Sequence, residues 1–503
     1  MNYRSTRDPS QQKTASQVIA QGISQEGGLF VPGQFPRLED RLPELSGMSY
    51  QELAREIFRL FLTDFTEEEI ASCVENAYRA EKFGGGEPVK LTPLPAEGED
   101  KYLLELWHGP TCAFKDMALQ ILPHFLTVSL KKAQPGKEAL ILVATSGDTG
   151  KAALEGFQDV AGTRIAVFYP QDGVSPMQKR QMATQEGRNV MVCAIEGNFD
   201  DAQTAVKRIF TDGEMQELLA RHGLLFSSAN SINWGRLLPQ IVYYFYAYFR
   251  LAEQGALSLG EPMDVVVPTG NFGNILAAYY GRKMGLPVRK LVCASNRNKV
   301  LTDFIRTGVY DRRREFHATA SPSMDILISS NLERLLYDLS GEDSEKLRGW
   351  MESLSQKGCY QVEDAVGEKI RELFYGGFCD DEATFSTIRE LWEKEGYLSD
   401  THTAVAVNVY RQYLKEAGLP PVPTVIASTA NPYKFSGSVL GALQADLLTQ
   451  DDFQNVEALE QLTGVQAPQQ LRQLREKPVR FTQVVEKDQA GTFVRQLVEQ
   501  GGN

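Results

Sequence analysis

The sequence predicts an α/β fold that is built from parallel β–α–β units and preceded by a helical N-terminal segment. Three observations support this prediction. Short apolar runs alternate with segments of helical periodicity between residues 139 and 294. Several of these runs end in loops rich in glycine, hydroxyl and amide side chains, and such strand ends are where open α/β sheets bind ligands. Residues 1–94 carry helical periodicity instead.

The N-terminal segment contains three predicted helices, at residues 15–22, 50–65 and 67–80. In the second helix, Leu53 and Ile57 are four residues apart and therefore share one face, which we expect to be buried. The segment thus predicts a small helical domain with its own apolar face.

The chain of 503 residues is too long for a single hydrophobic core, so several domains are expected. The stretch FGGGEP at residues 83–88 interrupts the helical pattern and indicates a boundary. We expect an N-terminal domain at residues 1–94, a central region at 95–450 with a smaller α/β domain at about 130–215, and a polar helical tail at 451–503.

The central region reads as alternating strands and helices. The predicted strands are residues 139–144, 164–169, 190–195, 263–267, 290–294 and 424–427. The predicted helices between them include residues 151–157, 175–186, 200–210 and 271–284. Alternation of this kind is typical of parallel sheets covered by helices.

Composition limits the possible partners and compartment. The net charge of −13, without a long basic run, argues against nucleic acid and against an anionic membrane surface. No apolar run reaches membrane-spanning length, and residues 1–7 carry no apolar signal core. The six scattered cysteines lack a CxxC pair, which is typical of reduced thiols in the cytoplasm. His108 and Cys112 are four apart but have no further ligand nearby, so no metal site is expected.

Lys115 stands out because of its position. It follows the apolar, turn-rich stretch LLELWHGPTCAF at residues 103–114 and opens another apolar segment at 117–130. A charged amine in such surroundings is costly unless it is paired, neutralised or used covalently, and lysine is the side chain that forms a Schiff base with an aldehyde. The local sequence is consistent with two interpretations of Lys115, a catalytic lysine and a surface lysine at the start of a helix.

Two strand-end loops have the composition of anion sites. The first, ATSGDTG at residues 144–150, lets backbone N–H groups approach an anion at a helix N-terminus. It does not fit the Walker P-loop pattern, and a plain helix cap remains the alternative reading. The second, PTGNFGN at residues 268–274, suits a phosphate cradle but lacks the GxGxxG dinucleotide fingerprint.

Two further loops are less specific. In ASTANP at residues 427–432, a hydroxyl at a strand end can hydrogen-bond a ring nitrogen, although an ST-turn explains the same residues. In SSANSINWGR at residues 227–236, Arg236 follows Asn233 by three residues. An amide and a guanidinium could hold a phosphate or carboxylate there, while a helix cap at Ser231 or Asn230 followed by a surface arginine is the simpler alternative.

Together these segments resemble the threonine synthase family of fold-type-II pyridoxal-phosphate enzymes. The matching pieces are WHGPTCAFKD at residues 107–116, ATSGDTG at 144–150, SANSIN at 228–233 and GNFG at 270–273. The leader is also similar, in YRSTR at residues 3–7 and in residues 22–32. The resemblance implies a tryptophan synthase β-like fold with two open parallel-type α/β sheets, and pyridoxal 5′-phosphate as cofactor.

The resemblance also implies a role for each candidate residue. Lys115 would be the Schiff-base lysine and the base that moves protons, Thr429 would face the pyridine nitrogen, and Asp148 would lie near the ring oxygen. The cofactor phosphate would be lined by Gly270, Asn271, Phe272, Gly273 and Asn274, and the substrate would be held by Ser146, Thr149, Asn233 and Arg236. The chain departs from the family pattern at Asn431, where a histidine is common, and at Asp148, where many fold-type-II relatives carry asparagine.

The activity that the resemblance implies is that of a carbon–oxygen lyase of threonine biosynthesis. Such an enzyme converts the small molecule O-phospho-L-homoserine and water to L-threonine and phosphate, in the cytoplasm, as a monomer or a homodimer. A dehydratase or a phospho-lyase of the same fold, which would release a 2-oxo acid, is one alternative. A catalytically silent binding protein is the other, and retention of Lys115 argues against it.

Overall fold

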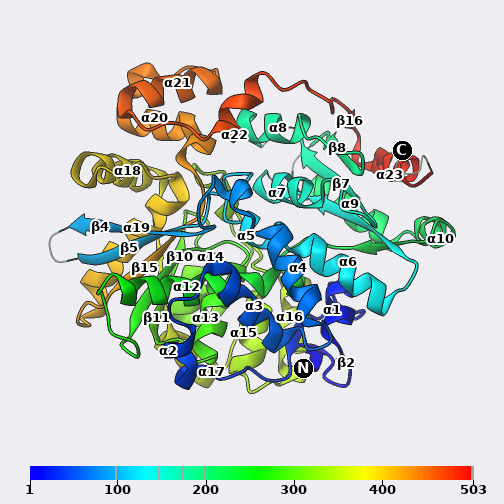
Figure 1. The fold of residues 1–503 in the computed structure, drawn as a ribbon, viewed down its shortest axis with the longest axis horizontal. Coiled ribbons are helices and arrows are strands. Elements are labelled where there is room, and N and C mark those ends of the chain that lie inside the picture. The colour runs from blue at the N-terminus through cyan, green and yellow to red at the C-terminus, as the bar shows by residue number, and fades with distance from the viewer. Residues whose placement is uncertain (97–98, 146, 172–173, 198, 500–503) are drawn as a thin grey trace.

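The computed structural model describes residues 1–96, 99–145, 147–171, 174–197 and 199–499, and it contains two parallel sheets that are covered by helices (Figure 1). The larger sheet has the strand order β14-β11-β10-β15-β5-β4, in which β4 alone is antiparallel to its neighbour. The smaller sheet has the order β16-β8-β7-β6-β9, and all of its pairs are parallel. The predicted pair of open parallel-type sheets is therefore confirmed.

The large sheet is apolar through its centre, because helices cover both of its faces. Every residue of β10 is buried, as expected for a central parallel strand. The strands are β4 (Lys90–Ala96), β5 (Glu99–Glu105), β10 (Met263–Pro268), β11 (Val288–Ser295), β14 (Phe374–Phe378) and β15 (Thr424–Ser428). The helices of this part include α12 (Pro239–Glu253), α13 (Gly273–Lys283), α14 (Val300–Thr307), α15 (Leu332–Leu339), α16 (Ser344–Lys357), α17 (Asp364–Leu373), α18 (Asp381–Glu395) and α19 (Thr401–Ala417). A short antiparallel pair of strands, β12 (Val309–Asp311) and β13 (Cys359–Gln361), lies beside them.

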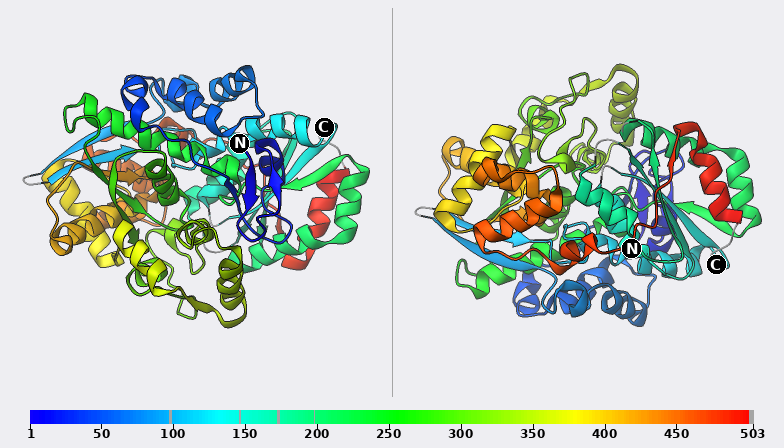
Figure 2. Two further views of the ribbon diagram at one scale, coloured as in Figure 1. Left: turned by 90° about the horizontal axis from the view of Figure 1, so that it is seen from below. Right: turned by 90° about the horizontal axis from the view of Figure 1, so that it is seen from above.

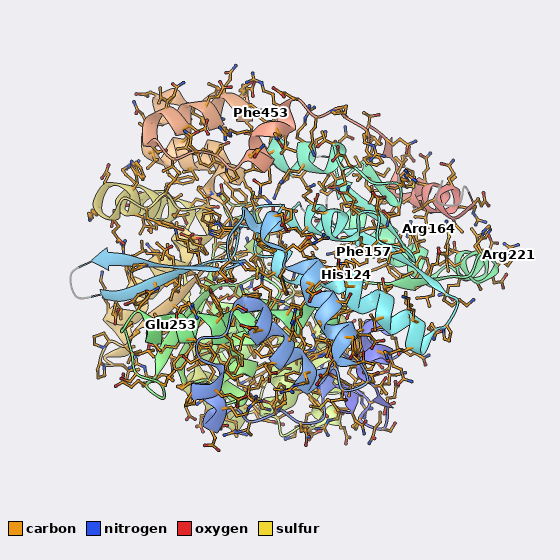
Figure 3. The ribbon with its side chains drawn as sticks, in the orientation of Figure 1. His124, Phe157, Arg164, Arg221, Glu253 and Phe453 are labelled. Carbon is orange, nitrogen blue, oxygen red and sulfur yellow. The ribbon has the colours of Figure 1, made fainter. Side chains whose placement is uncertain are left out.

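The small sheet forms the second α/β unit. Its strands are β6 (Glu138–Ala144), β7 (Thr163–Pro170), β8 (Val190–Ile195), β9 (Leu224–Ser227) and β16 (Val484–Val485). Its helices are α7 (Asp148–Phe157), α8 (Pro176–Ala183), α9 (Phe199–Thr211) and α10 (Gly213–Arg221). Figure 3 shows Arg221, at the end of α10, at the outer edge of this unit, and Glu253, at the end of α12, on the opposite side of the molecule.

The N-terminal residues form a helical layer that also contains a small sheet. The helices are α1 (Ala15–Gln21), α2 (Leu42–Leu45), α3 (Tyr50–Phe61) and α4 (Glu67–Ala77), and the antiparallel sheet has the order β2-β1-β3, from Gln12–Lys13, Tyr3–Ser5 and Phe30–Pro32. Helix α3 starts with a capping box between Ser49 and Glu52, and it buries Leu53 and Ile57 completely. The predicted helices are thus present, whereas the short strands lacked a sequence signal of sufficient length.

The C-terminal tail connects the two α/β units. Helices α20 (Ser436–Gln444), α21 (Asp452–Thr463) and α22 (Gln469–Arg472) share a core with α18, whereas α23 (Ala490–Glu499) packs on the small sheet. Figure 2 shows this segment pass from the orange α20 and α21 to the red α23. The guanidinium of Arg180 on α8 donates to the carbonyl oxygens of Leu474, Arg475 and Lys477 and so anchors the crossing. The prediction for residues 451–503 was a helical tail. The segment also contributes strand β16, so it is not purely helical.

Among the described residues, none of the helices combines the length and the apolar character that are needed to cross a bilayer.

Candidate active site around Lys115

Lys115 lies in the loop between β5 and the short helix α5 (Asp116–Leu119), next to the loop that follows β15. The N–H of Phe114 donates to the carbonyl of Thr429 at 2.8 Å, and the N–H of Asn431 donates to the carbonyl of Cys112 at 3.0 Å. These two bonds make a short antiparallel bridge between the loops. Lys115 is therefore held beside Thr429, although more than 300 residues separate them in the chain.

Asp116 fixes the shape of the Lys115 loop, a role that the sequence did not reveal. Its carboxylate accepts from the N–H of Thr111 at 2.8 Å and from the Thr111 hydroxyl at 2.7 Å. A Cβ on Gly109 would lie 2.5 Å from Asp116 Oδ2, so only glycine fits at that position. Burial raises the pKa of Asp116 to about 6. The HGPT motif thus serves to build a rigid turn in front of the lysine.

Close packing also places α7 against the segment that follows Lys115. A Cβ on Gly156 would lie 1.9 Å from the carbonyl oxygen of Leu119, so the last turn of α7 touches the end of α5 directly. A side chain there would push the two helices apart. The contact therefore fixes the last turn of α7 against the segment that follows Lys115.

The amine of Lys115 makes no hydrogen bond or ion pair to the part of the chain that the structure describes, and it lies 5.9 Å from the centroid of the Phe114 ring. Burial lowers the pKa of Lys115 to about 8, against an opposing effect of Asp148 and with a smaller lowering effect of Arg236 and Lys434. An unpaired amine with a depressed pKa is partly neutral near physiological pH, and the neutral form is the nucleophile.

The loop from Gly270 to Asn274 presents unused hydrogen-bond donors. Phe272 adopts a left-handed backbone conformation with φ of 64°, which turns the chain into α13. The carbonyl of Gly270 accepts from the Ser329 hydroxyl at 2.7 Å, and the carbonyl of Asn271 accepts from Asn331. Within the described residues, the N–H groups of 270–272 donate to no acceptor. The loop is therefore held through its carbonyls while its amides remain available to an anion.

Asn274 supplies a buried donor to the same loop. Its Oδ1 accepts from the hydroxyls of Tyr243 and Tyr244, whereas its Nδ2 is buried without a partner in the described structure. A buried amide N–H without an acceptor costs free energy, so the group is expected to have a ligand. This orphaned donor, together with the free backbone amides, fits a phosphate group.

Arg236 is buried without a carboxylate partner among the described residues. One guanidinium nitrogen donates to the carbonyl of Ala229 at 2.8 Å, while Nε has no partner and burial lowers the pKa of Arg236 to about 10. Its positive charge also reaches Lys115, since it contributes to lowering the pKa of that amine. A buried, unpaired guanidinium next to a free amine indicates a site for an anion.

Asn233 acts as the N-cap of the short helix α11 (Trp234–Leu237). Its Oδ1 accepts from the N–H of Gly235 at 2.9 Å, and its Nδ2 donates to the carbonyls of Ile19 and Ser228. The cap is therefore Asn233 itself rather than Ser231 or Asn230. The side chain is fully buried and positions the first turn that carries Arg236.

The remaining predicted residues are placed around the same loops. Thr429 is buried, and its hydroxyl contacts no other polar group in the described ranges, so it is open to a ligand. Thr149 lies in the first turn of α7 and is partly exposed. Ser146, which the sequence also nominated, lies outside the described residues.

Asp148 is engaged by residues that the sequence did not single out. Its carboxylate pairs with the amine of Lys434 at 2.6 Å and accepts from Gln178 at 3.0 Å and from the Ser323 hydroxyl at 3.3 Å. Burial raises its pKa, but the two nearby lysines, Lys434 foremost, outweigh this effect and hold the pKa of Asp148 below its usual range. Lys434 was not singled out, although it stands between Tyr433 and Phe435, three residues after Asn431.

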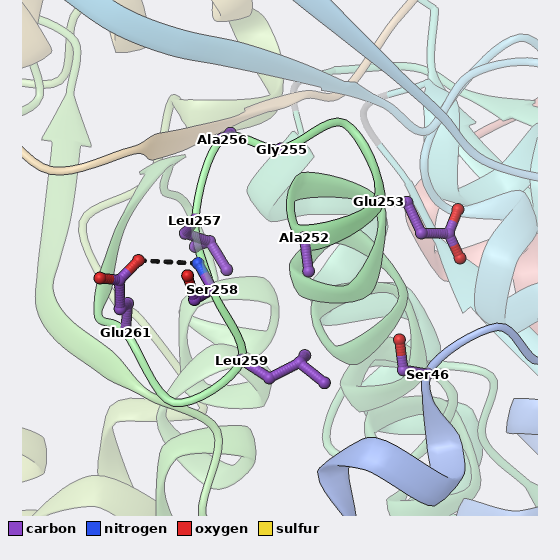
Figure 4. Close-up of a pocket in the computed structure, with 9 residues that line it drawn as sticks. All are labelled: Ser46, Ala252, Glu253, Gly255, Ala256, Leu257, Ser258, Leu259 and Glu261. Atoms are coloured by element: carbon purple, nitrogen blue, oxygen red, sulfur yellow. Dashed lines mark hydrogen bonds between the residues drawn. The ribbon is translucent and has the colours of Figure 1, made fainter.

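A separate hollow of about 520 Å³ on the surface does not resemble this site (Figure 4). Its lining includes Ser46, Glu253 and Glu261 and contains no lysine or arginine. Glu261 accepts from the N–H of Ser258 at 2.7 Å and so closes the loop after α12. A hollow with two carboxylates is not suited to a phosphorylated ligand, so the site remains around Lys115.

Three family models together cover the chain. Residues 2–78 match the model described as threonine synthase N terminus, residues 81–429 match pyridoxal-phosphate dependent enzyme, and residues 403–496 match threonine synthase, C-terminal. The N-terminal layer, the two sheets and the connecting tail thus each have a counterpart in these models.

Individual relatives agree with the models. A threonine synthase from Pseudomonas aeruginosa is 40% identical over 443 residues, which are 87% of this chain and 90% of that protein. The human protein threonine synthase-like 1 is 40% identical over 86% of this chain, but the chain spans only 58% of its length. A pyridoxal-phosphate-bound threonine synthase from Brucella melitensis superposes with a TM-score of 0.87 at 36% identity, with 99% of both chains covered.

Proposed function

The chain belongs to the threonine synthase family of pyridoxal-phosphate-dependent enzymes, and we propose from this premise that it converts O-phospho-L-homoserine and water to L-threonine and phosphate. One observation carries the choice of a phosphorylated substrate: Arg236 is a buried guanidinium without a carboxylate partner in the described structure, and its Nε has no hydrogen-bond partner there. A phosphate on the substrate would supply the missing anion.

Pyridoxal phosphate would be held by residues at three strand ends. Lys115 would bind the aldehyde carbon, the amides of Gly270 to Asn274 with Asn274 Nδ2 would bind the phosphate, and the Thr429 hydroxyl would face the ring nitrogen. The orphaned Nδ2 of Asn274 and the free loop amides support this assignment. When bound, the cofactor supplies an aldehyde for amines and a conjugated ring that accepts negative charge from a neighbouring carbon.

The protein residues would divide the remaining work between proton transfer and charge stabilisation. In its free form, the amine of Lys115 would remove the α-proton and exchange protons at the β-carbon, for which a pKa of about 8 is well suited. Arg236 would hold the substrate phosphate and stabilise its charge as it leaves the γ-carbon. Thr149 and the first turn of α7 would line the same end of the site. Asn233 would keep Arg236 in place by capping α11.

The identity of the product tests this proposal. With O-phospho-L-homoserine as substrate, we expect L-threonine and inorganic phosphate in equal amounts, measured by amino-acid chromatography and a phosphate assay. A 2-oxo acid as the main product would instead assign the chain to a dehydratase or phospho-lyase. We also propose a cytoplasmic setting, which the six free cysteines support.

Replacement of Arg334 by methionine is expected to weaken cofactor binding and to destabilise the fold. This fully buried guanidinium donates to the carbonyls of Phe30 and Ile232 and to the side chain of Asn331, which holds the carbonyl of Asn271. The variant leaves these acceptors unpaired, so the free energy of unfolding should fall by about 2–4 kcal/mol. The dissociation constant of pyridoxal phosphate should rise about tenfold, because the phosphate loop loses its support.

Urea unfolding and a cofactor titration measure the two effects. Arg282→Met is the matched control, because its guanidinium also donates to a backbone carbonyl, that of Val288, but at the far end of α13. The control should lose stability without losing cofactor affinity. Equal loss of affinity in both variants would contradict a specific connection between Arg334 and the loop.

A further inference from the structure

A buried ion pair joins the two α/β units next to the loop that carries Lys115. Lys434 lies in the 3₁₀ turn η4 (Pro432–Phe435) after β15, and Asp148 is the first residue of α7 in the small unit. Their side chains are 0% and 3% exposed, and the amine nitrogen lies 2.6 Å from the carboxylate oxygen. The same amine donates to the carbonyl of Thr111 at 3.0 Å, which belongs to the Lys115 loop. One lysine therefore contacts both the small unit and the loop that carries Lys115.

Energetic considerations argue against a purely stabilising role for this pair. Removing two charges from water costs several kcal/mol per ion, and well-packed apolar side chains commonly do as well or better at such positions. Asp148 also receives bonds from Gln178 and Ser323, so three groups of the protein are arranged around a single carboxylate. Such an arrangement around the Asp148 carboxylate, next to the loop of a reactive amine, indicates that the pair controls the charge of that amine rather than supporting the fold.

The charges around Lys115 come from three elements and act in opposite directions. Asp148 at the start of α7 attracts a proton to the amine, whereas Arg236 on α11 and Lys434 in η4 repel it. Asp148 and Lys434 are in contact, so each also limits the effect of the other on Lys115. A carboxylate that stood alone in this position would hold Lys115 in its protonated, unreactive form.

We propose that Lys434 is a positioning residue that neutralises Asp148 and thereby sets the charge at Lys115. The ion pair as a whole is neutral, as an asparagine at position 148 would be. The proposal rests on the proposed function in one respect, namely that Lys115 is the residue that joins the cofactor. It assigns no contact with the substrate to Lys434.

Cofactor uptake measures the charge at Lys115 without any catalytic turnover. The neutral Lys115 amine adds to the cofactor aldehyde and one water molecule leaves, so the uptake rate rises with pH as the amine loses its proton. The full-length protein is freed of cofactor, mixed with pyridoxal phosphate at a series of pH values, and followed by visible absorbance. The pH midpoint of the uptake rate is compared among wild type, Lys434→Met, Asp148→Asn and the double variant.

The proposal predicts shifts of opposite sign for the two single variants. Lys434→Met leaves Asp148 unneutralised and should raise the midpoint by about one pH unit. Asp148→Asn leaves Lys434 unneutralised and should lower it by about the same amount. The double variant restores neutrality and should return to within about half a unit of wild type. Unchanged midpoints, or shifts of one sign in both single variants, would overturn the proposal.

Two further variants separate a charge effect from a folding effect. Lys101→Met removes another buried lysine, which pairs with Glu395 at 3.0 Å, and should lower the melting temperature while leaving the midpoint unchanged. Lys434→Arg keeps the charge and should keep the wild-type midpoint, even if the larger side chain lowers stability. A shifted midpoint in Lys101→Met or in Lys434→Arg would show that the shifts follow from a general loss of stability rather than from the charge of Lys434, and would overturn the proposal. Failure to form threonine would reject the proposed function but would not alter these midpoints.

Discussion

Replacement of Lys115 by alanine is expected to lower the turnover of O-phospho-L-homoserine by about 1,000-fold or more. The variant removes the amine that joins the cofactor and, once it is freed, moves the α-proton; proton transfer alone is worth about 100- to 10,000-fold. The visible absorbance that pyridoxal phosphate acquires on joining the enzyme should also disappear. Because the amine makes no hydrogen bond or ion pair to the described residues, the fold should not depend on it.

Lys290→Ala is a matched control for this experiment. Burial also lowers the pKa of Lys290, but its amine donates to the carbonyls of Arg371 and Glu372, away from the site. The control should keep both the turnover and the visible absorbance. If Lys115→Ala retained either property with added cofactor, Lys115 would not be the cofactor lysine, and a binding protein without catalysis would become the better reading.

Replacement of Arg236 by methionine is expected to lower kcat/KM for O-phospho-L-homoserine by about 100- to 1,000-fold, or about 3–4 kcal/mol. The guanidinium is already buried in the free protein, so binding a phosphate dianion does not require a further loss of its hydration. Inhibition by inorganic phosphate should weaken in parallel. The affinity for L-threonine, which has no phosphate, should remain close to that of wild type.

The comparison with L-threonine distinguishes phosphate recognition from general damage to the site. The unfolding free energy should fall by no more than about 1 kcal/mol, because the variant removes a buried charge that lacks a carboxylate partner in the described structure. Arg250→Met is a suitable control, since its Nε is also buried without a partner but its guanidinium pairs with Glu253 on the outer end of α12. Equal losses of affinity for the phosphorylated and unphosphorylated ligands would contradict the assignment of Arg236.

The alternation of strands and helices was readable from the sequence because buried parallel strands are short apolar runs. Strand β8 was predicted with its observed bounds, and β10 and β15 extend only one residue beyond the prediction. By contrast, β16 has two residues, of which Val484 is largely exposed, and it exists only because the edge of β8 offers partners. No local pattern can predict a strand that a distant edge creates.

The candidate site was readable where a single residue type carries the chemistry. Lys115 and the glycine loop at 270–274 have unusual compositions in their own segments. The role of Lys434 was not readable in this way, because its importance comes from the carboxylate of Asp148, which lies 286 positions earlier in the chain and in the other α/β unit. Asn233 also has partners that the sequence did not reveal, since its Oδ1 caps α11 and its Nδ2 donates to the carbonyls of Ile19 and Ser228.

The short pairing of β16 with β8 has a consequence for self-association. The N–H groups of Ala194 and Glu196 on the rim of the small sheet donate to the carbonyls of Gln483 and Val485, at 2.9 and 3.0 Å. Without the tail, this rim would present free amides on an apolar strand, which is the template on which another chain can add a strand. Strand β16 thus occupies the position that a second molecule would otherwise take, and because it is only two residues long it offers little length for a second molecule to extend.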